Sequence, residues 1–203
     1  MGQNKMNSQD EIRFGMIKKR HRETFKQAVS EGKADKKMIP LCRFVSKTKN
    51  YFTSSSCSGR ILLLSLDKGE RKKVSAFHRK WHRKVKFAEV RKALDEKTAY
   101  SVWLKQEAFI LHIGTGDLTH AKQILSVMTK SGIKRGGIIV AKPGKFIVEL
   151  QGTQGLAIPI KIGDELLISD EYLKTLVDIA NDKYEKNDSA LNRFEKVVRA
   201  ELE

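Results

Sequence analysis

The fold is decided by residues 108–150, AFILHIGTGDLTHAKQILSVMTKSGIKRGGIIVAKPGKFIVEL. Three short apolar runs in this stretch are typical of strands, and one longer run with apolar residues every three or four positions is typical of a helix. The predicted order is the strand Ala108–Ile113, the helix Leu118–Lys130, the strand Gly137–Ala141 and, after a turn at Pro143-Gly144, the strand Phe146–Leu150. Strands separated by both a helix and a tight turn predict an α+β (mixed α/β) fold, in which helices flank a mixed β-sheet.

The sequence on either side extends this pattern. Downstream, we predict a strand at 156–160 and a helical C-terminus that starts at Asp170 and has a polar break near 186–189. Upstream, we predict a helix at 10–32, a short helix that Pro40 opens, and strands at 51–53 and 60–66 joined by a loop at 54–59. No linker rich in Gly, Ser or Pro divides the chain, so residues 1–203 are predicted to form one domain, with interlocked halves 1–100 and 101–203 as the alternative.

The net positive charge lies entirely in the first half. The chain carries 40 Lys and Arg against 24 Asp and Glu, a formal charge of +16. Residues 1–100 hold 26 basic and 10 acidic residues, whereas residues 101–203 hold 14 of each. A field this one-sided attracts polyanions, because phosphate contacts release condensed counterions. Nucleic acid is the predicted partner; the alternative, a lysine-rich solubilising surface, would spread over both halves.

Composition excludes other classes. The longest apolar runs have four or five residues, far short of the ~20 that a helix needs to cross a bilayer, and no secretory signal follows the polar start. Cys42 and Cys57 are too few for a disulfide framework, and a zinc site would have to borrow histidines, so no metal is expected. We therefore expect a cytoplasmic protein with reduced thiols and no membrane contact.

The run Tyr51-Phe-Thr-Ser-Ser-Ser-Cys-Ser-Gly-Arg60 is the sharpest local feature. Small hydroxyl residues and Gly59 allow backbone N–H groups to turn toward a ligand, and Arg60 can bind a carboxylate or phosphate with two hydrogen bonds. These features predict a ligand-binding loop. The alternative is a polar turn whose serines bond to their own backbone.

A basic segment, Lys68 to Lys92, holds 11 basic and 2 acidic residues, with helical spacing over 87–94. Its cations can follow a phosphate backbone while an aromatic ring stacks on a base. We predict that it contacts RNA through Arg71, Lys72, Lys73, Arg79, Lys80, Arg83 and Lys84, with Trp81 and His82 as functional residues and Phe77 and Phe87 as core. The alternative is a solvated amphipathic element.

Two further features carry weak signals. The run from His112 through Gly114-Thr115-Gly116 suggests a nucleotide-binding loop, but the third glycine of that motif is missing, and His112 is more often a hydrogen-bonded core residue on such a strand. Cys57 could be a nucleophile, although nothing in the sequence places a base beside it. No Walker loop, HExxH motif or carboxylate pair is present.

The residues Thr53 to Arg60 fit the signature S/T-x-S-S-C-x-G-R, and the chain thereby resembles the wybutosine-synthesis methyltransferases. These enzymes methylate a ring nitrogen of the tricyclic base beside the anticodon of phenylalanine tRNA. The resemblance extends over nearly the whole chain, in order and spacing, through Asp35, Pro40-Leu41, Trp81-His82, the strand 108–112, Ser131-Gly132-Ile133, Gly137-Ile138, Gly152 to Leu156 and Pro159. The Gly114-Thr115-Gly116 triplet is not part of that pattern.

The resemblance implies S-adenosylmethionine as methyl donor, nitrogen N4 of a wyosine-type base in phenylalanine tRNA as acceptor, and a fold unlike the Rossmann methyltransferases; no obligate protein partner is inferred. Direct displacement at a sulfonium carbon needs alignment rather than a covalent nucleophile. We expect Asp35 or His82 to accept the proton that the ring nitrogen loses. The residues expected to bind the donor or the acceptor are Thr53, Ser55, Ser56, Cys57, Gly59, Arg60, Trp81, His112, Thr153 and Gly155.

Two other functions stay open on the sequence. One is a non-catalytic RNA-binding module that uses the basic segment and Trp81 to stack bases. The other, which the sequence favours least, is an RNA-modifying enzyme that acts through the Cys57 thiol.

Overall fold

A computed structural model describes residues 6–67 and 76–202. The chain forms two compact units, each assembled from separate stretches of sequence. The first unit takes in the described residues of 1–58, 109–153 and 189–203, and the second those of 59–108 and 154–188. Both units draw on both halves of the sequence, and the single-domain organisation stays a prediction.

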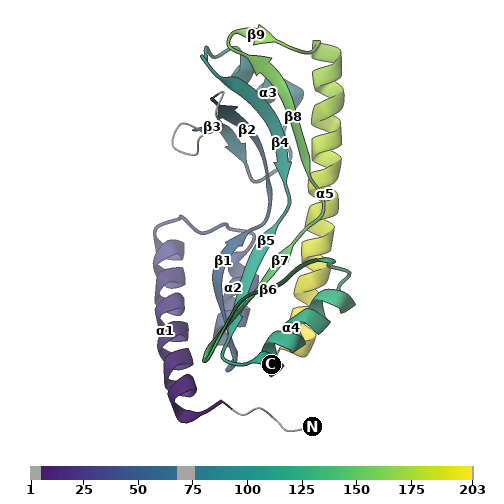
Figure 1. Cartoon of the computed structure of the whole chain (residues 1–203). Coiled ribbons are helices and arrows are strands. Elements are labelled where there is room, and N and C mark those ends of the chain that lie inside the picture. Colours follow the sequence, from purple (N-terminus) through teal and green to yellow (C-terminus); the bar gives the residue numbers. More distant parts are fainter. Residues whose placement is uncertain (1–5, 68–75, 203) are drawn as a thin grey trace. The chain divides into compact units, whose positions relative to one another are not determined.

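The first unit contains a four-stranded antiparallel sheet with the strand order β1-β5-β7-β6. Its strands are β1 (Tyr51–Cys57), β5 (Ile110–Thr115), β6 (Arg135–Lys142) and β7 (Lys145–Gln151). Its helices are α1 (Ser8–Ser30), α2 (Ile39–Lys47), α4 (Leu118–Lys130) and residues 189–201 of α5 (Asp170–Glu201) (Figure 1).

Alternation along the strands buries apolar side chains on both faces of this sheet. Leu111 and Val148 pack into a core with α2, α4 and the end of α5. On the other face, Phe52 packs against Phe14 of α1, with ring centroids 6.1 Å apart. Gly114 lies beside Phe52, and a Cβ there would come within 2.1 Å of the Phe52 ring. This close approach lets α1 lie over the sheet next to β1.

The second unit contains a five-stranded antiparallel sheet with the order β3-β2-β4-β8-β9. Its elements are β2 (Arg60–Leu66), β3 (Ala76–Trp81), α3 (Phe87–Leu94), β4 (Ser101–Glu107), β8 (Leu156–Ile162), β9 (Glu165–Leu166) and residues 170–188 of α5. Ile61 and Leu104 of the sheet pack against Val90 of α3 and Leu173 of α5 in a separate core.

The α+β class with helices flanking the strands is confirmed, but the expectation of one mixed sheet is not met. The described strands form two sheets, and within each sheet every pair of neighbouring strands is antiparallel. The predicted loop at 54–59 is also wrong, because β1 continues to Cys57 and only Ser58 and Gly59 separate it from β2, which belongs to the other sheet. The serine run is therefore strand and not loop. Its backbone pairs with β5 regardless of side-chain polarity.

The predicted break in the last helix does not occur. Lys186 lies 3.4 Å from the Asp182 carboxylate one turn earlier, and the polar Asn187 is buried. A polar stretch supported by an i,i+4 pair and a buried amide continues a helix. No helix among the described residues is long and apolar enough to span a bilayer.

Candidate functional site

The hydroxyl-rich strand β1 is an edge strand of the first unit's sheet. A register shift between Thr53 and Ser55 leaves Ser54 as an extra residue, and Ser54 and Ser55 are exposed. The hydroxyls of Thr53 and Ser56 hydrogen-bond with the thiol of Cys42 in α2, and burial raises the pKa of that thiol. The hydroxyls of Thr53 and Ser56 thus hold β1 against α2, whereas those of Ser54 and Ser55 face outward.

These outward hydroxyls border a cavity of about 190 Å³. The cavity lies between α1, the segment 33–35 and β1, and it is lined by His21, Thr24, Phe25, Ala28, Lys33, Ala34, Asp35, Thr53, Ser54, Ser55 and Ser56. The structure therefore brings together Asp35, Thr53, Ser55 and Ser56 of the predicted site. We call this space the signature cavity.

Asp35 is held at the end of β1 by two backbone groups. One carboxylate oxygen accepts a hydrogen bond from the Ser58 N–H (2.6 Å) and the other from the Lys37 N–H (3.1 Å). A carboxylate oxygen also lies within 4.8 Å of the Cys57 sulfur. Hydrogen bonds from backbone N–H groups to a carboxylate are among the stronger ones in proteins, so the Asp35 carboxylate is fixed beside β1.

His21 is a cavity residue that sequence reasoning missed. Its ring stacks on Phe52 with centroids 4.7 Å apart and an interplanar angle of 11°. Burial, with smaller contributions from Lys145 and Arg20, lowers the pKa of His21 below its usual 6.5. The imidazole is thus neutral at pH 7 and can accept a hydrogen bond or a proton. The only sequence signal was a histidine within the helix predicted at 10–32.

The lowered pKa of His21 predicts a pH-dependent contribution to stability. Since the unfolded chain binds this proton at higher pH than the folded chain, the neutral ring contributes fully above pH 6.5 and its contribution is lost as the pH falls toward the folded pKa. We expect the loss in unfolding free energy caused by His21→Gln to be larger at pH 7.5 than at pH 5. Urea denaturation of both proteins at the two pH values measures it, and a loss independent of pH would contradict the assignment.

His112 lies on the neighbouring strand, in register with Ser55. Its Nε2 is 2.8 Å from a carboxylate oxygen of Glu149 on β7. This pair continues the polar row from β1 across the sheet. Thr153, also in the first unit, is exposed, and among the described residues neither Thr153 nor His112 lines the signature cavity.

The second unit holds the other predicted site residues. The Arg60 guanidinium bonds to Glu107 (2.7 Å) and lies over the Phe77 ring, 4.7 Å from its centroid. Gly59 is buried with φ +92°, a conformation that favours glycine, and Gly155 is exposed. Trp81 is half-buried against the core of this unit, and His82 is also half-buried.

The basic segment is partly strand and largely ion-paired where the structure describes it. Arg79 pairs with Glu96, Arg83 with Glu89 and Lys84 with Glu185, while the Lys80 ammonium lies 5.4 Å from the Phe77 ring centroid. Exposed pairs of this kind contribute about 0–1 kcal/mol, so phosphates can replace the carboxylates. Phe87 packs on the core as predicted, but Phe77 is 52% exposed and the core prediction for it is wrong. Arg71, Lys72 and Lys73 lie outside the described residues.

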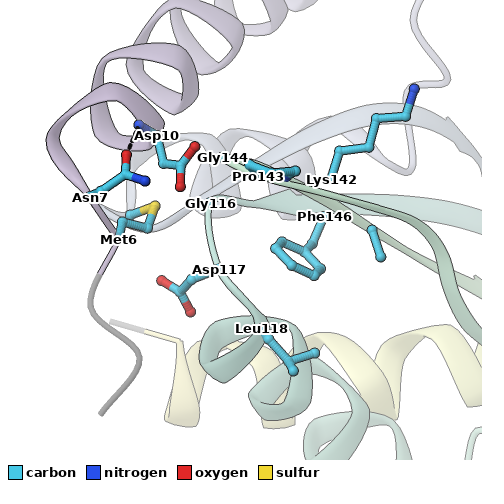
Figure 2. A pocket seen from close by; sticks show the side chains of 11 residues that line it. Met6, Asn7, Asp10, Gly116, Asp117, Leu118, Lys142, Pro143, Gly144 and Phe146 are labelled. Atoms are coloured by element: carbon cyan, nitrogen blue, oxygen red, sulfur yellow. Dashed lines mark hydrogen bonds between the residues drawn. The ribbon is translucent and has the colours of Figure 1, made fainter.

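A larger cavity, of about 400 Å³, lies where the start of α1 meets the turn before α4 and the turn between β6 and β7 (Figure 2). Two of its polar groups, those of Asp117 and Asn7, serve as helix caps. Asp117 accepts a hydrogen bond from the His120 N–H (2.8 Å) and bonds the His120 ring with its other oxygen (2.6 Å). Asn7 likewise accepts from the Asp10 N–H (2.8 Å), as Figure 2 shows. The Gly114-Thr115-Gly116 run thus leads into an ordinary helix N-cap.

Comparison with known proteins agrees with the signature. A protein of Pyrococcus horikoshii named tRNA(Phe) 7-((3-amino-3-carboxypropyl)-4-demethylwyosine(37)-N(4))-methyltransferase 1 is 30% identical over 92% of this chain and 95% of its own length. The mouse tRNA wybutosine-synthesizing protein 3 homolog is 35% identical over 81% of this chain and 65% of its own. The solved structure of the PH1069 protein from Pyrococcus horikoshii superposes with a TM-score of 0.87, at 30% identity over 92% of this chain and 96% of that one.

The family match takes in both units. The model of the family described as Methyltransferase TYW3 matches residues 15–200, which include every residue that lines the signature cavity. The chain therefore belongs to this methyltransferase family.

Proposed function

We propose that this protein transfers a methyl group from S-adenosylmethionine to ring nitrogen N4 of a demethylated wyosine-type base next to the anticodon of phenylalanine tRNA. Family membership and the names of the relatives support the reaction class and the tRNA. The observation that carries the proposal is the signature cavity, where outward hydroxyls of β1 and a fixed Asp35 carboxylate border the same space. A cytoplasmic location follows from this substrate.

The residues of the cavity fit such a donor. S-Adenosylmethionine supplies, when bound, a methyl carbon made electrophilic by a sulfonium, and it also carries an ammonium group and ribose hydroxyls. The hydroxyls of Ser54 and Ser55 are acceptors suited to those groups. A neutral His21 adds no positive charge that would repel a cationic ligand. The volume of about 190 Å³ accommodates part of the donor.

The chain has two tasks in this reaction. It aligns the acceptor nitrogen with the methyl carbon, which can remove up to ~7–11 kcal/mol of the barrier in favourable cases, and it receives the proton that the nitrogen loses as the N–C bond forms. We assign the proton to Asp35, with His82 as the alternative acceptor. Ser55 and Arg60 orient the donor or the base, and Ser56 supports β1 through its hydrogen bond with Cys42. Trp81 and the cations of the second unit contact the tRNA.

Isotopic methyl transfer tests the proposed function. The protein is incubated with methyl-labelled S-adenosylmethionine and with phenylalanine tRNA that carries the demethylated base, and label in the RNA is counted. Label that requires both the protein and the hypomodified base is the expected result. Tight tRNA binding without label would replace the proposal with a non-catalytic RNA-binding module.

The proposal also predicts that the Cys57 thiol is dispensable. Cys57→Ser keeps a small polar side chain at the end of β1, and a direct displacement uses no enzyme nucleophile. We expect methyl transfer to fall less than about tenfold in the variant, whereas a covalent mechanism would lose nearly all of its rate. Single-turnover label transfer at equal protein concentrations measures this, and complete loss of activity would indicate a thiol mechanism.

A further inference from the structure

The first unit has a second concave surface on the far side of Phe25, between α1 and α2. This groove has a volume of about 320 Å³ and is lined by Arg22, Phe25, Lys26, Val29, Ser30, Arg43, Ser46 and Lys47. We call it the α1–α2 groove. Phe25 lines both this groove and the signature cavity, so the two spaces share a wall within one unit.

The rim of the groove is cationic. Arg22 and Lys26 of α1 and Arg43 and Lys47 of α2 are all exposed, and none of the described residues that line the groove is acidic. Within residues 6–67 and 76–202, none of the four makes an ion pair with a carboxylate, in contrast to Arg79, Arg83 and Lys84 of the second unit. Nearby, burial lowers the pKa of Lys18 to about 8, and the charge of Arg22 makes a smaller contribution.

The floor of the groove is apolar. Phe25 and Val29, one turn apart on α1, are half-buried, and Phe25 packs against the core of the unit. A groove that combines an aromatic ring with four cations suits a ligand that has both a flat apolar part and a negative charge. A nucleotide within an RNA strand meets this description, since its base can stack and its phosphate can pair with Arg or Lys.

We infer that the α1–α2 groove binds a nucleotide of the tRNA anticodon loop next to the base that enters the signature cavity. The inference rests on the proposed function for the identity of the RNA. The shared Phe25 wall places the groove beside the cavity, so one strand can serve both. The free cations hold its phosphates, and the ring of Phe25 supports the neighbouring base or sugar. The basic segment of the second unit is then a separate contact.

Removal of two cations from α2 tests the phosphate contacts. We expect Arg43→Ala/Lys47→Ala to bind the anticodon stem-loop of phenylalanine tRNA about tenfold more weakly. The slope of log affinity against log salt becomes shallower by about 1.4, the value for two contacts on a single strand. The matched control is Lys122→Ala/Lys134→Ala, which removes two exposed cations near α4 of the same unit. Fluorescence anisotropy between low and moderate salt gives both quantities.

Replacement of the ring tests the stacking part. Phe25→Leu keeps an apolar side chain, and we expect it to weaken stem-loop binding about fivefold without a change in the salt slope. Because Phe25 also packs on the core, thermal melting and circular dichroism establish that the variant is folded at the assay temperature.

Either of two results with the variants would overturn the inference: wild-type affinity in the Arg43/Lys47 variant, or an equal loss of affinity in the control pair. Displacement of the stem-loop by polyglutamate at equal charge concentration would also overturn it, and would assign the groove to an acidic protein segment. The assay contains no methyl donor and measures binding alone. A protein that binds the loop through the groove but transfers no methyl group would thus refute the proposed function and leave this inference standing. A protein that transfers the methyl group but does not bind the loop through the groove would refute this inference and leave the proposed function standing.

Discussion

Asp35→Ala and Asp35→Asn should both lose about 10²–10⁴ in turnover while each variant keeps its affinity for tRNA. Neither new side chain can accept the proton. Asn retains a carbonyl oxygen and can still accept one of the two backbone hydrogen bonds, from the Ser58 or the Lys37 N–H, whereas Ala accepts neither. Steady-state methyl transfer with both substrates saturating, together with stem-loop anisotropy, measures the two quantities.

The two substitutions distinguish a role of Asp35 in proton transfer from a purely structural role. If Asp35 only ties the end of β1 to the segment 33–35, Asn should recover much of the activity that Ala loses. Asp178→Asn is the matched control, since that exposed carboxylate lies on α5 in the second unit. Full turnover in either Asp35 variant would contradict the assigned role and leave His82 as the acceptor.

Gly114→Ala should destabilise the first unit by about 3 kcal/mol, at the upper end for an overpacked core. Its Cβ would meet three atoms of the Phe52 ring at 2.1 to 2.5 Å. Phe52 is fully buried and has His21 stacked on one side, so the ring has little room to move. The displaced ring would carry His21 with it, and methyl transfer should fall as well.

A second glycine of the same sheet provides the control. Gly137 on β6 has no atom of a described residue within 4 Å of where a Cβ would be, so Gly137→Ala should change stability by less than about 0.5 kcal/mol. Urea denaturation of both variants gives the comparison. Equal stability of the two variants would show that the Phe52 ring can move aside. It would contradict the claim that β1 and α1 hold His21 at the cavity.

The parts of the fold that depend on local sequence were predictable. Helix α4 covers Leu118–Lys130 and helix α3 covers Phe87–Leu94, as the apolar spacing predicts, because a helix makes its hydrogen bonds within its own segment. Strand β4 escaped prediction, because the end of Ser101–Glu107 is polar and its buried Gln106 resembles a surface residue. Strand β3 was not predicted either, because its composition is basic.

The candidate site was predictable in its residue types but not in its construction. The hydroxyl run was singled out, yet it was taken for a loop, because the thiol that bonds Thr53 and Ser56 belongs to Cys42 in another element. The choice of Asp35 as a site residue came from the family resemblance, and its position beside β1 was not predicted, since no local pattern links residue 35 to residue 58. His21 reaches the cavity only because α1 packs on Phe52, a contact between distant parts of the sequence.

The most direct test of the account is to identify the methylated nucleoside. Phenylalanine tRNA with the demethylated tricyclic base is incubated with the protein and S-adenosylmethionine bearing a trideuterated methyl group, digested to nucleosides and analysed by tandem mass spectrometry. We expect one new nucleoside, in which the intact trideuteriomethyl group is on nitrogen N4 of the tricyclic base. Methylation at any other nucleoside, or an unchanged tricyclic base under conditions where the tRNA is fully bound, would contradict it.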